Sequence, residues 1–180
     1  MPARAAPAAT GFTMIELMIA VSITVALGAI ASPSLAQLVS RHRLQEAAHG
    51  LQSDLAQARH VALRLGMPVW ASFQPGAKWC YALSVGQPVN CHGPTPGVQV
   101  LNIVHASRYP QVQMLQADTM ALDGRSGLAQ ANQGQLPKAV LASQHGQRVE
   151  VRLGAMGRAS LCNPDRAQPG HGACIELAEP

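Results

Sequence analysis

The sequence is poor in charged and in aromatic side chains. Of its 180 residues only 12% are Asp, Glu, Lys or Arg, and only 3% are Phe, Trp or Tyr, while the hydrophobic fraction is 48%. Intrinsically disordered chains combine low hydrophobicity with high charge, so this composition excludes a disordered chain. The few aromatic residues argue against a large aromatic-rich core. The length fits one domain with little left over.

Motifs of common enzyme classes are also missing. The sequence contains no GxSxG, no HExxH and no glycine-rich phosphate loop. His42, Glu46 and His49 could share one helical face and hold zinc, but such a short run on a polar face is far more often a solvated surface. The seven histidines form no other cluster along the chain. We therefore expect no catalytic residue, no cofactor and no metal site, and a protein that is not an enzyme.

The few charges are distributed unevenly. Between Phe12 and Ser40 only Glu16 is charged, and the 23 residues from Leu17 to Val39 carry no charge at all. As a helix this run would be about 35 Å long, enough to cross a hydrocarbon core of about 30 Å. The sequence has no second run of this kind. It therefore predicts one membrane-entering segment near the N-terminus, followed by a soluble part.

A conventional secretory signal is the alternative interpretation of this segment. Residues 29–31, Ala-Ile-Ala, have the small-residue pattern of a signal cleavage site, and cutting there would release a soluble protein that begins at Ser32. However, the apolar run continues to Val39. The Glu16 carboxylate would also cost up to about 3 kcal/mol in a membrane helix, depending on depth. A disposable signal has no use for such a residue.

Residues 11–17, Gly-Phe-Thr-Met-Ile-Glu-Leu, resemble the class III signal of type IV pilin-like proteins. The resemblance implies that a prepilin peptidase cuts between Gly11 and Phe12 and that Phe12 is then N-methylated. Glu16 takes the place of the family's glutamate at the fifth mature position, and Pro33 that of a helix-bending proline in many members. A buried carboxylate needs a partner, which the new α-amino group of a neighbouring subunit can supply. Alternatively, Glu16 lies near the lipid headgroups.

The helix is expected to continue beyond the apolar run, from Thr13 to Leu65. Apolar residues recur there at spacings of four and three and form one stripe: Leu44, Ala48, Leu51, Leu55, Ala58, Ala62 and Leu65. Gly66 and Pro68 supply the stop signal. Pro33 is expected to bend or loosen the helix.

After Pro68 the pattern changes to short apolar stretches separated by turn residues. We predict strands at 69–73, 79–85, 98–104, 112–115, 139–142 and 149–153. The fold class is therefore α+β: a long N-terminal helix, membrane-inserted in its first half, packed on a small antiparallel β-sheet domain. The uncharged stretch 79–107 fits buried strands, with a subunit contact surface as the alternative.

The four cysteines are expected to form disulfides, because an export-type segment takes the chain out of the reducing cytosol. No pair has CxxC spacing, which disfavours a redox motif or a zinc knuckle. Three connectivities are open, and proximity in the chain favours Cys80–Cys91 and Cys162–Cys174.

The layout resembles one branch of the pilin superfamily, the GspH/FimT-type minor pilins and pseudopilins. The matching segments are 51–59, 66–69 and 157–162. The resemblance divides the chain into a leader (1–11), a transmembrane and assembly half of the helix (12–39), an amphipathic half (40–66) and a periplasmic GspH-like β-rich domain (67–180).

The function implied by the resemblance is structural. The chain would be a minor subunit of a pilus-like filament, in first place a type II secretion pseudopilin. The alternative is a type IV minor pilin in pilus assembly or DNA uptake. The implied partners are prepilin peptidase, other pilins or pseudopilins through the N-terminal helix, and the inner membrane. The protein would be single-pass, with its C-terminal domain periplasmic, and would later lie at the filament or pseudopilus tip.

DNA binding is the remaining expectation to weigh. Some FimT-like members bind DNA through a Gly-Arg-any-Arg stretch, but here Ser160 stands where the second arginine would be. Arg152 and Arg158 are the candidate phosphate contacts in a stretch with five basic and two acidic residues, from Lys138 to Arg166. That stretch holds no aromatic residue for base stacking. A solvated strand edge protected by charge is the favoured interpretation.

Overall fold

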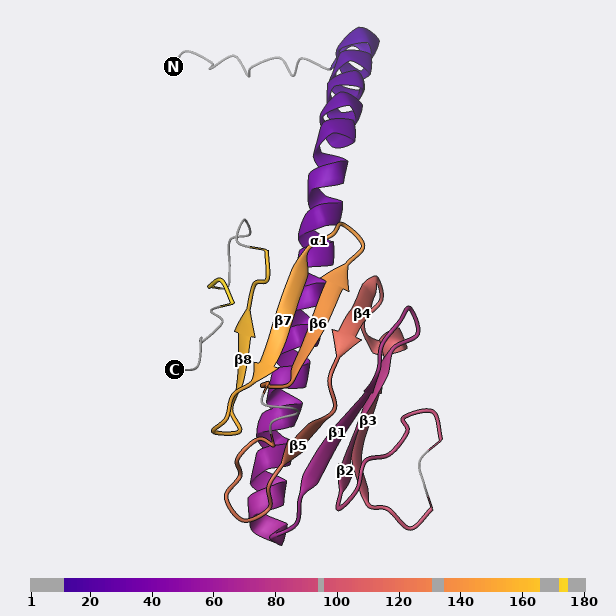
Figure 1. Cartoon of the computed structure of the whole chain (residues 1–180). Coiled ribbons are helices and arrows are strands. Elements are labelled where there is room, and N and C mark those ends of the chain that lie inside the picture. The colour runs from indigo at the N-terminus through magenta and orange to yellow at the C-terminus, as the bar shows by residue number, and fades with distance from the viewer. Residues whose placement is uncertain (1–11, 94–95, 131–134, 166–171, 175–180) are drawn as a thin grey trace, which may run out of the picture. The chain divides into compact units, whose positions relative to one another are not determined.

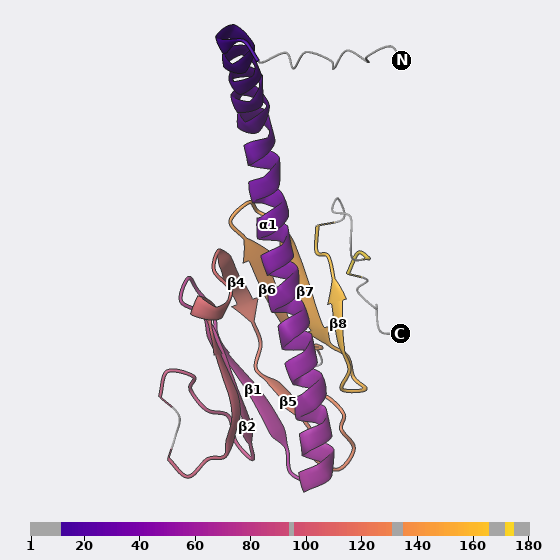
Figure 2. The same ribbon diagram turned by 180° about the vertical axis from the view of Figure 1, so that it is seen from behind.

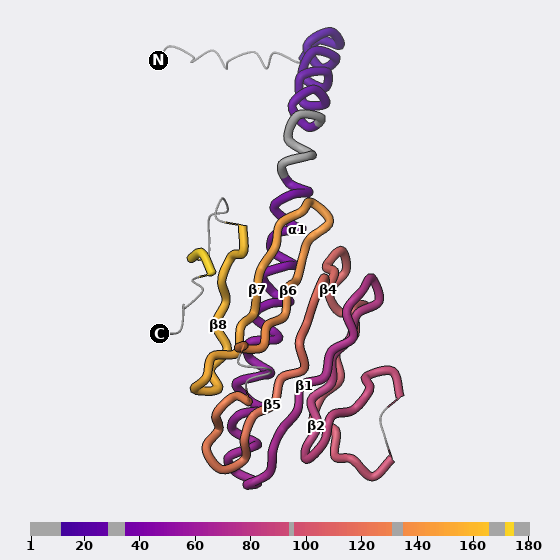
Figure 3. The backbone as a smooth tube through the Cα atoms, viewed as in Figure 1, coloured from indigo at the N-terminus to yellow at the C-terminus, as the bar shows by residue number. Residues whose placement is uncertain are grey.

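The computed structural model describes residues 12–93, 96–130, 135–165 and 172–174 (Figure 1). Of helix residues 29–34 it describes the backbone only, and Figure 3 draws this segment in grey. The expected leader, 1–11, lies outside the described residues. The chain divides into two compact units, Met1–Leu38 and Val39–Pro180, and each is described by itself.

One helix, α1 (Met14–Leu65), confirms the predicted helix bounds to within one residue. Its start is capped by Thr13, whose Oγ1 accepts a hydrogen bond from the backbone N–H of Glu16 at 3.3 Å. Its end is formed by Gly66, which adopts φ +64° and donates its N–H to the Ala62 carbonyl at 2.9 Å. This is the left-handed cap that glycine adopts without steric cost. Within the described residues, no helix has a stretch long and apolar enough to cross a membrane.

In its described residues, the second unit contains two antiparallel sheets of four strands each, whereas the sequence predicts a single sheet. The first has the order β3 (Val100–His105), β2 (Cys80–Val85), β1 (Val69–Gln74), β5 (Met120–Leu122). The second has the order β4 (Val112–Ala117), β6 (Lys138–Ser143), β7 (Arg148–Leu153), β8 (Ala159–Cys162). A short 3₁₀ helix, η1 (Ala106–Arg108), follows β3. The class α+β is confirmed.

The six predicted strands are all present, and the structure adds β5 and β8. The chain alternates between the sheets: it enters the second sheet with β4, returns to the first with β5 beside β1, and goes back with β6. β5 has three residues and β8 four, too few to show a strand pattern in the sequence. The single expected sheet was therefore wrong, because strand order is set by tertiary packing.

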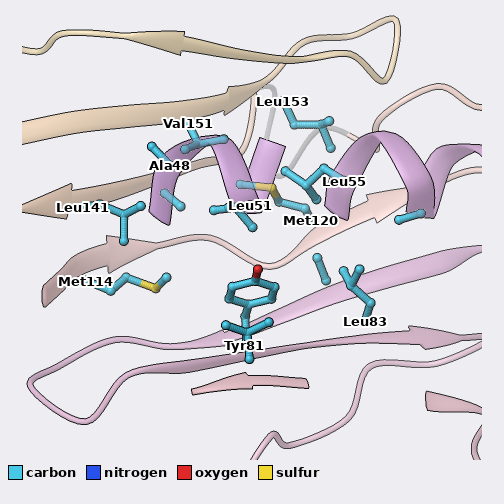
Figure 4. Packing of buried hydrophobic residues seen from close by; sticks show 14 of the residues in the cluster. Ala48, Leu51, Leu55, Tyr81, Leu83, Met114, Met120, Leu141, Val151 and Leu153 are labelled. Carbon is cyan, nitrogen blue, oxygen red and sulfur yellow. The ribbon is translucent and has the colours of Figure 1, made fainter. Parts of the chain in front are cut away.

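The core lies where the amphipathic half of α1 covers both sheets (Figures 2 and 4). Six of the seven residues of the predicted stripe are buried: Leu44, Ala48, Leu51, Leu55, Ala58 and Ala62. Leu65 is 43% exposed, contrary to the prediction, at the last helical residue. Both sheets contribute buried side chains to the same cluster, among them Leu83, Met114, Met120, Leu141, Val151 and Leu153. Complete burial of one such leucine contributes about 2 kcal/mol.

Candidate functional site

The first unit exposes an apolar helix surface. All described side chains at residues 12–28 and 35–38 are exposed. Twelve of them are large and hydrophobic: Phe12, Met14, Ile15, Leu17, Met18, Ile19, Val21, Ile23, Val25, Leu27, Leu35 and Leu38. Monomeric proteins in water rarely expose contiguous apolar surface of this kind, which marks contact with other proteins or with lipid. We call this surface, residues 12–28 and 35–38, the apolar helix segment.

The few hydroxyl groups of the apolar helix segment are satisfied within the helix. Ser22 Oγ donates to the Met18 carbonyl at 2.8 Å, and Thr24 Oγ1 donates to the Ala20 carbonyl at 2.5 Å. These bonds to the preceding turn need no water. The surface that the segment presents is therefore apolar apart from Glu16 near its start and Gln37 near its end.

Glu16 lies in the first turn of α1, and Phe12 precedes the helix with 83% of its surface exposed. Within the described part of the chain, the Glu16 carboxylate has no cationic partner. Pro33 lies within α1, but its side chain is outside the description, so the expected bend stays a prediction. Gly11, the expected cleavage residue, is outside the described residues.

Both predicted disulfides are confirmed. Cys80 at the start of β2 is bonded to Cys91 in the following loop, with 6.0 Å between the Cα atoms. Cys162 at the end of β8 is bonded to Cys174, with 4.8 Å between the Cα atoms. Each bond closes a short loop, with sequence separations of 11 and 12. Loop closures of this size contribute about 3 kcal/mol in the chain-entropy description.

The two candidate DNA contacts have different surroundings. Arg152 donates from Nε and Nη2 to Glu150 Oε1, at 2.9 and 2.7 Å, and its side chain is only 20% exposed. Its guanidinium is therefore engaged by a buried carboxylate within β7. Arg158 is exposed in the turn before β8. The structure thus presents one of the two arginines to solvent.

Gly157, which precedes Arg158, has a structural reason to be glycine. It adopts φ +70°, and a Cβ placed there would collide with the Gly127 carbonyl oxygen. That oxygen also accepts a hydrogen bond from Arg59 Nε of α1 at 3.0 Å. The Gly-Arg pair of the GspH/FimT-like segment therefore includes a residue required for packing.

A polar contact between α1 and the first sheet was not predicted from the sequence. Asp54 Oδ2 accepts hydrogen bonds from Tyr81 Oη at 2.7 Å and from Asn102 Nδ2 at 3.0 Å. Figure 4 shows the Tyr81 hydroxyl pointing toward the helix. Burial, and then the bond to Asp54, raise the pKa of Tyr81 well above its usual range. Nothing in the sequence pattern links three residues so far apart in the chain.

Replacing Asp54 with Ala is expected to destabilise the domain by about 2–3 kcal/mol, because a buried tyrosine hydroxyl and an amide lose their acceptor. Asp54→Asn keeps an acceptor oxygen and should cost less. Tyr81→Phe should cost about 1–1.5 kcal/mol. Urea denaturation of the detergent-solubilised full chain, followed by tryptophan fluorescence, measures these changes. Additive losses in the double variant would contradict a coupling between the two side chains.

The raised pKa of Tyr81 also predicts a pH dependence. The folded protein keeps the phenol neutral, whereas the unfolded chain ionises it at its ordinary value near 10. Above that pH the unfolded state binds fewer protons than the folded state, so stability falls as pH rises. Tyr81→Phe should show a shallower fall between pH 9 and about 11.

The histidines are grouped differently from the expectation. His42 pairs with Glu46, Nδ1 to Oε1 at 3.6 Å, and His49 Nδ1 lies 3.4 Å from Gln52 Oε1, so the helical set does not converge. His92 and His105, by contrast, have ring centroids 6.2 Å apart. These two histidines are 13 residues apart, so the spacing of histidines along the chain does not reveal the pair. Their proximity depends on strand pairing, which the sequence does not display.

Comparison with known proteins found no relative of this chain. No protein-family model, no curated protein and no solved structure matches this chain. The case for a function therefore depends on the sequence motif around Gly11 and Glu16 and on the surfaces described above.

Proposed function

We propose that this chain is a structural subunit of a pilus-like filament, assembled through the apolar helix segment. The observation that carries the proposal is that every described side chain of that segment is exposed. Keeping apolar surface out of water, in lipid or among other helices, is worth about 25 cal/mol per Å² relative to exposing it to water. In a filament, the helices of neighbouring subunits would cover the apolar surface that this segment leaves exposed.

The membrane is part of the same proposal. The uncharged run from Leu17 to Val39 would hold the unassembled subunit in the inner membrane as a single-pass protein. The run includes residues 29–34, whose side chains are outside the description. The C-terminal domain would be periplasmic, and its two disulfides fit an oxidising compartment.

Assembly would follow cleavage by prepilin peptidase. The cut after Gly11 creates a charged α-amino group on Phe12, which the resemblance implies is methylated. In a filament this amino group would neutralise the Glu16 carboxylate of a neighbouring subunit, since a carboxylate among apolar helices needs a partner. The chain itself would catalyse nothing.

Within this class we favour a GspH-type pseudopilin of a type II secretion machine. The alternative, a type IV minor pilin with a role in DNA uptake, gains little support from Arg152, which is engaged by Glu150. The two can be separated by deleting the gene. Loss of protein secretion would support the pseudopilin, and loss of twitching or transformation would support the minor pilin.

The mature N-terminus tests the proposal. Intact-mass and peptide mass spectrometry of the membrane-extracted protein should show Phe12 as the first residue with one added methyl group. Gly11→Val should leave the leader attached. Gly28→Ala is the matched control, because a Cβ at Gly28 meets nothing within 4 Å, and it should be processed normally. A chain that begins at Ser32 would overturn the proposal in favour of a conventional signal.

A further inference from the structure

We propose that Cys80, Cys91, His92 and His105 form a zinc site when the two cysteines are reduced. Two thiolates and two imidazoles are the ligand set of many structural zinc sites. This site is separate from the apolar helix segment, and the inference does not depend on the proposed filament function.

Strand pairing and the loop bring the four residues together. In the register of β2 and β3, Cys80 stands directly opposite His105. Residues opposite each other on antiparallel strands have Cβ atoms about 5 Å apart on the same face. The disulfide brings Cys91 to Cys80, and His92 is its chain neighbour. Three different parts of the fold, β2, β3 and the loop between them, therefore converge on one point.

The separations suit a tetrahedral ion. Cys80 Sγ lies 3.4 Å from His92 Nε2. Cys80, His92 and His105 each offer a ligand atom, and these atoms all lie within 4.8 Å of one another. A zinc ion with Zn–S of about 2.3 Å and Zn–N of about 2.05 Å separates its sulfur and nitrogen ligands by about 3.5 Å. Cys91 Sγ is bonded to Cys80 Sγ but is not one of these three atoms. On reduction the two sulfur atoms would separate, and the Cys91 side chain and the imidazoles would have to adjust to place four ligand atoms around the ion.

Burial divides the site into a closed and an open side. Cys80 and Cys91 are 0% and 3% exposed, and they lie in a small apolar cluster with Ala82 and Val89. His92 and His105 are exposed. The apolar side would keep water from the thiolates, and the histidine side would let an ion enter from solvent.

Metal and disulfide exclude each other. The zinc-bound thiolates of Cys80 and Cys91 lose two electrons when the S–S bond forms. A disulfide oxidant takes up these electrons with two protons and becomes two thiols, and Zn²⁺ is released. The site therefore exists in the chain before oxidation and is lost on oxidation. Zinc would hold the hairpin and its loop together until the disulfide replaces it.

A second cluster in the described residues, Glu150 with Cys162 and Cys174, is the internal comparison. It offers no imidazole, and its carboxylate is engaged by Arg152. We expect it to bind a metal ion much more weakly. Removing its two cysteines therefore provides a matched control.

Cobalt titration of the full chain in detergent tests the inference. The protein is reduced with a phosphine without oxygen, and Co²⁺ serves as a spectroscopic substitute for zinc. One equivalent should give thiolate-to-cobalt charge transfer and the intense visible bands of a tetrahedral site, and Zn²⁺ should abolish both. The oxidised protein should give neither. The double substitution His92→Ala/His105→Ala should weaken binding by about tenfold or more, and circular dichroism checks its folding.

The controls decide the location. Cys162→Ser/Cys174→Ser should bind cobalt as the wild type does, and loss of the bands in this variant would overturn the assignment. Unchanged affinity in the histidine double variant would overturn it as well, as would no binding by the reduced wild type. If Cys80→Ser/Cys91→Ser fails to fold, the exposed histidines still provide the test.

Discussion

Replacing Gly157 with Ala is expected to lower the free energy of unfolding by roughly 3–5 kcal/mol, a large effect for a single added methyl group. Two costs combine at this position. The backbone has φ +70°, which costs an L-residue about 1–2 kcal/mol. The new Cβ would also meet the Gly127 carbonyl oxygen and lie 3.1 Å from Arg59 Nε. Relieving that collision would disturb the hydrogen bond from Arg59 to Gly127.

Substitutions at two other glycines measure the backbone strain and the steric collision separately. Gly146 has φ +79° with nothing within 4 Å of a Cβ, so Gly146→Ala should cost only the backbone strain, about 1–2 kcal/mol. A Cβ at Gly124, where no left-handed φ occurs, would collide with the backbone of Gly66 and Met67. Gly124→Ala therefore isolates the steric cost.

Urea denaturation of the three variants, followed by far-UV circular dichroism, measures these differences. We expect the loss in Gly157→Ala to exceed that in Gly146→Ala by about 2 kcal/mol or more. Equal losses in Gly157→Ala and Gly146→Ala would mean that the loop at Gly127 moves away from the new Cβ at little cost in free energy. In that case the Gly127 carbonyl would not fix the turn before Arg158 against α1.

The helix and most strands could be predicted because local patterns specify them. The predicted stripe from Leu44 to Leu65 has the 3.6-residue period of a buried helix face, and six of its seven members are buried. Gly66 ends the helix through its own conformational freedom. The residue types of β7 alternate, and Val149, Val151 and Leu153 lie in the core, although Glu150 between the two valines is buried as well.

The arrangement of the strands could not be predicted in the same way. β5 is only three residues long and belongs to the first sheet because it pairs with β1, from Val69↔Leu122 to Ala71↔Met120. These partners are about fifty residues apart in the chain. Such pairing depends on which surfaces α1 covers, and no local pattern records that.

The candidate sites also divide into features that local sequence predicts and features that depend on tertiary packing. The disulfides join cysteines 11 and 12 residues apart, so proximity in the chain identified both pairs. The contact of Asp54 with Tyr81 and Asn102 joins α1 to β2 and β3 across long stretches of sequence. The register of β2 and β3 places His105 opposite Cys80 and changes between Leu83 and Ser84, where the strands shift. A one-residue error in this register would turn His105 to the opposite face.

Glu16→Gln is expected to remove most of the subunit from filaments while leaving cleavage and folding intact. If the carboxylate pairs with the α-amino group of a neighbouring Phe12 among apolar helices, its neutralisation leaves that cation buried without a counter-charge. Breaking a buried pair in this way costs about 3–5 kcal/mol, which corresponds to more than about a hundredfold in an association constant. Glu16→Leu should have the same effect, although it makes the helix more apolar.

Glu46→Gln is the matched control, because it makes the same change in the same helix at an exposed site that pairs with the exposed His42. The variants are expressed in cells that lack the native copy, and incorporation is measured as the share of subunit recovered with sheared filaments. Mass spectrometry of the N-terminus confirms processing in each variant. Glu46→Gln should incorporate normally. If Glu16→Gln also incorporates normally, apolar packing alone drives assembly, and the charge pair has no part in it. If Glu16→Leu incorporates better than the wild type, the carboxylate is a cost that the filament tolerates, as expected for a residue near lipid headgroups.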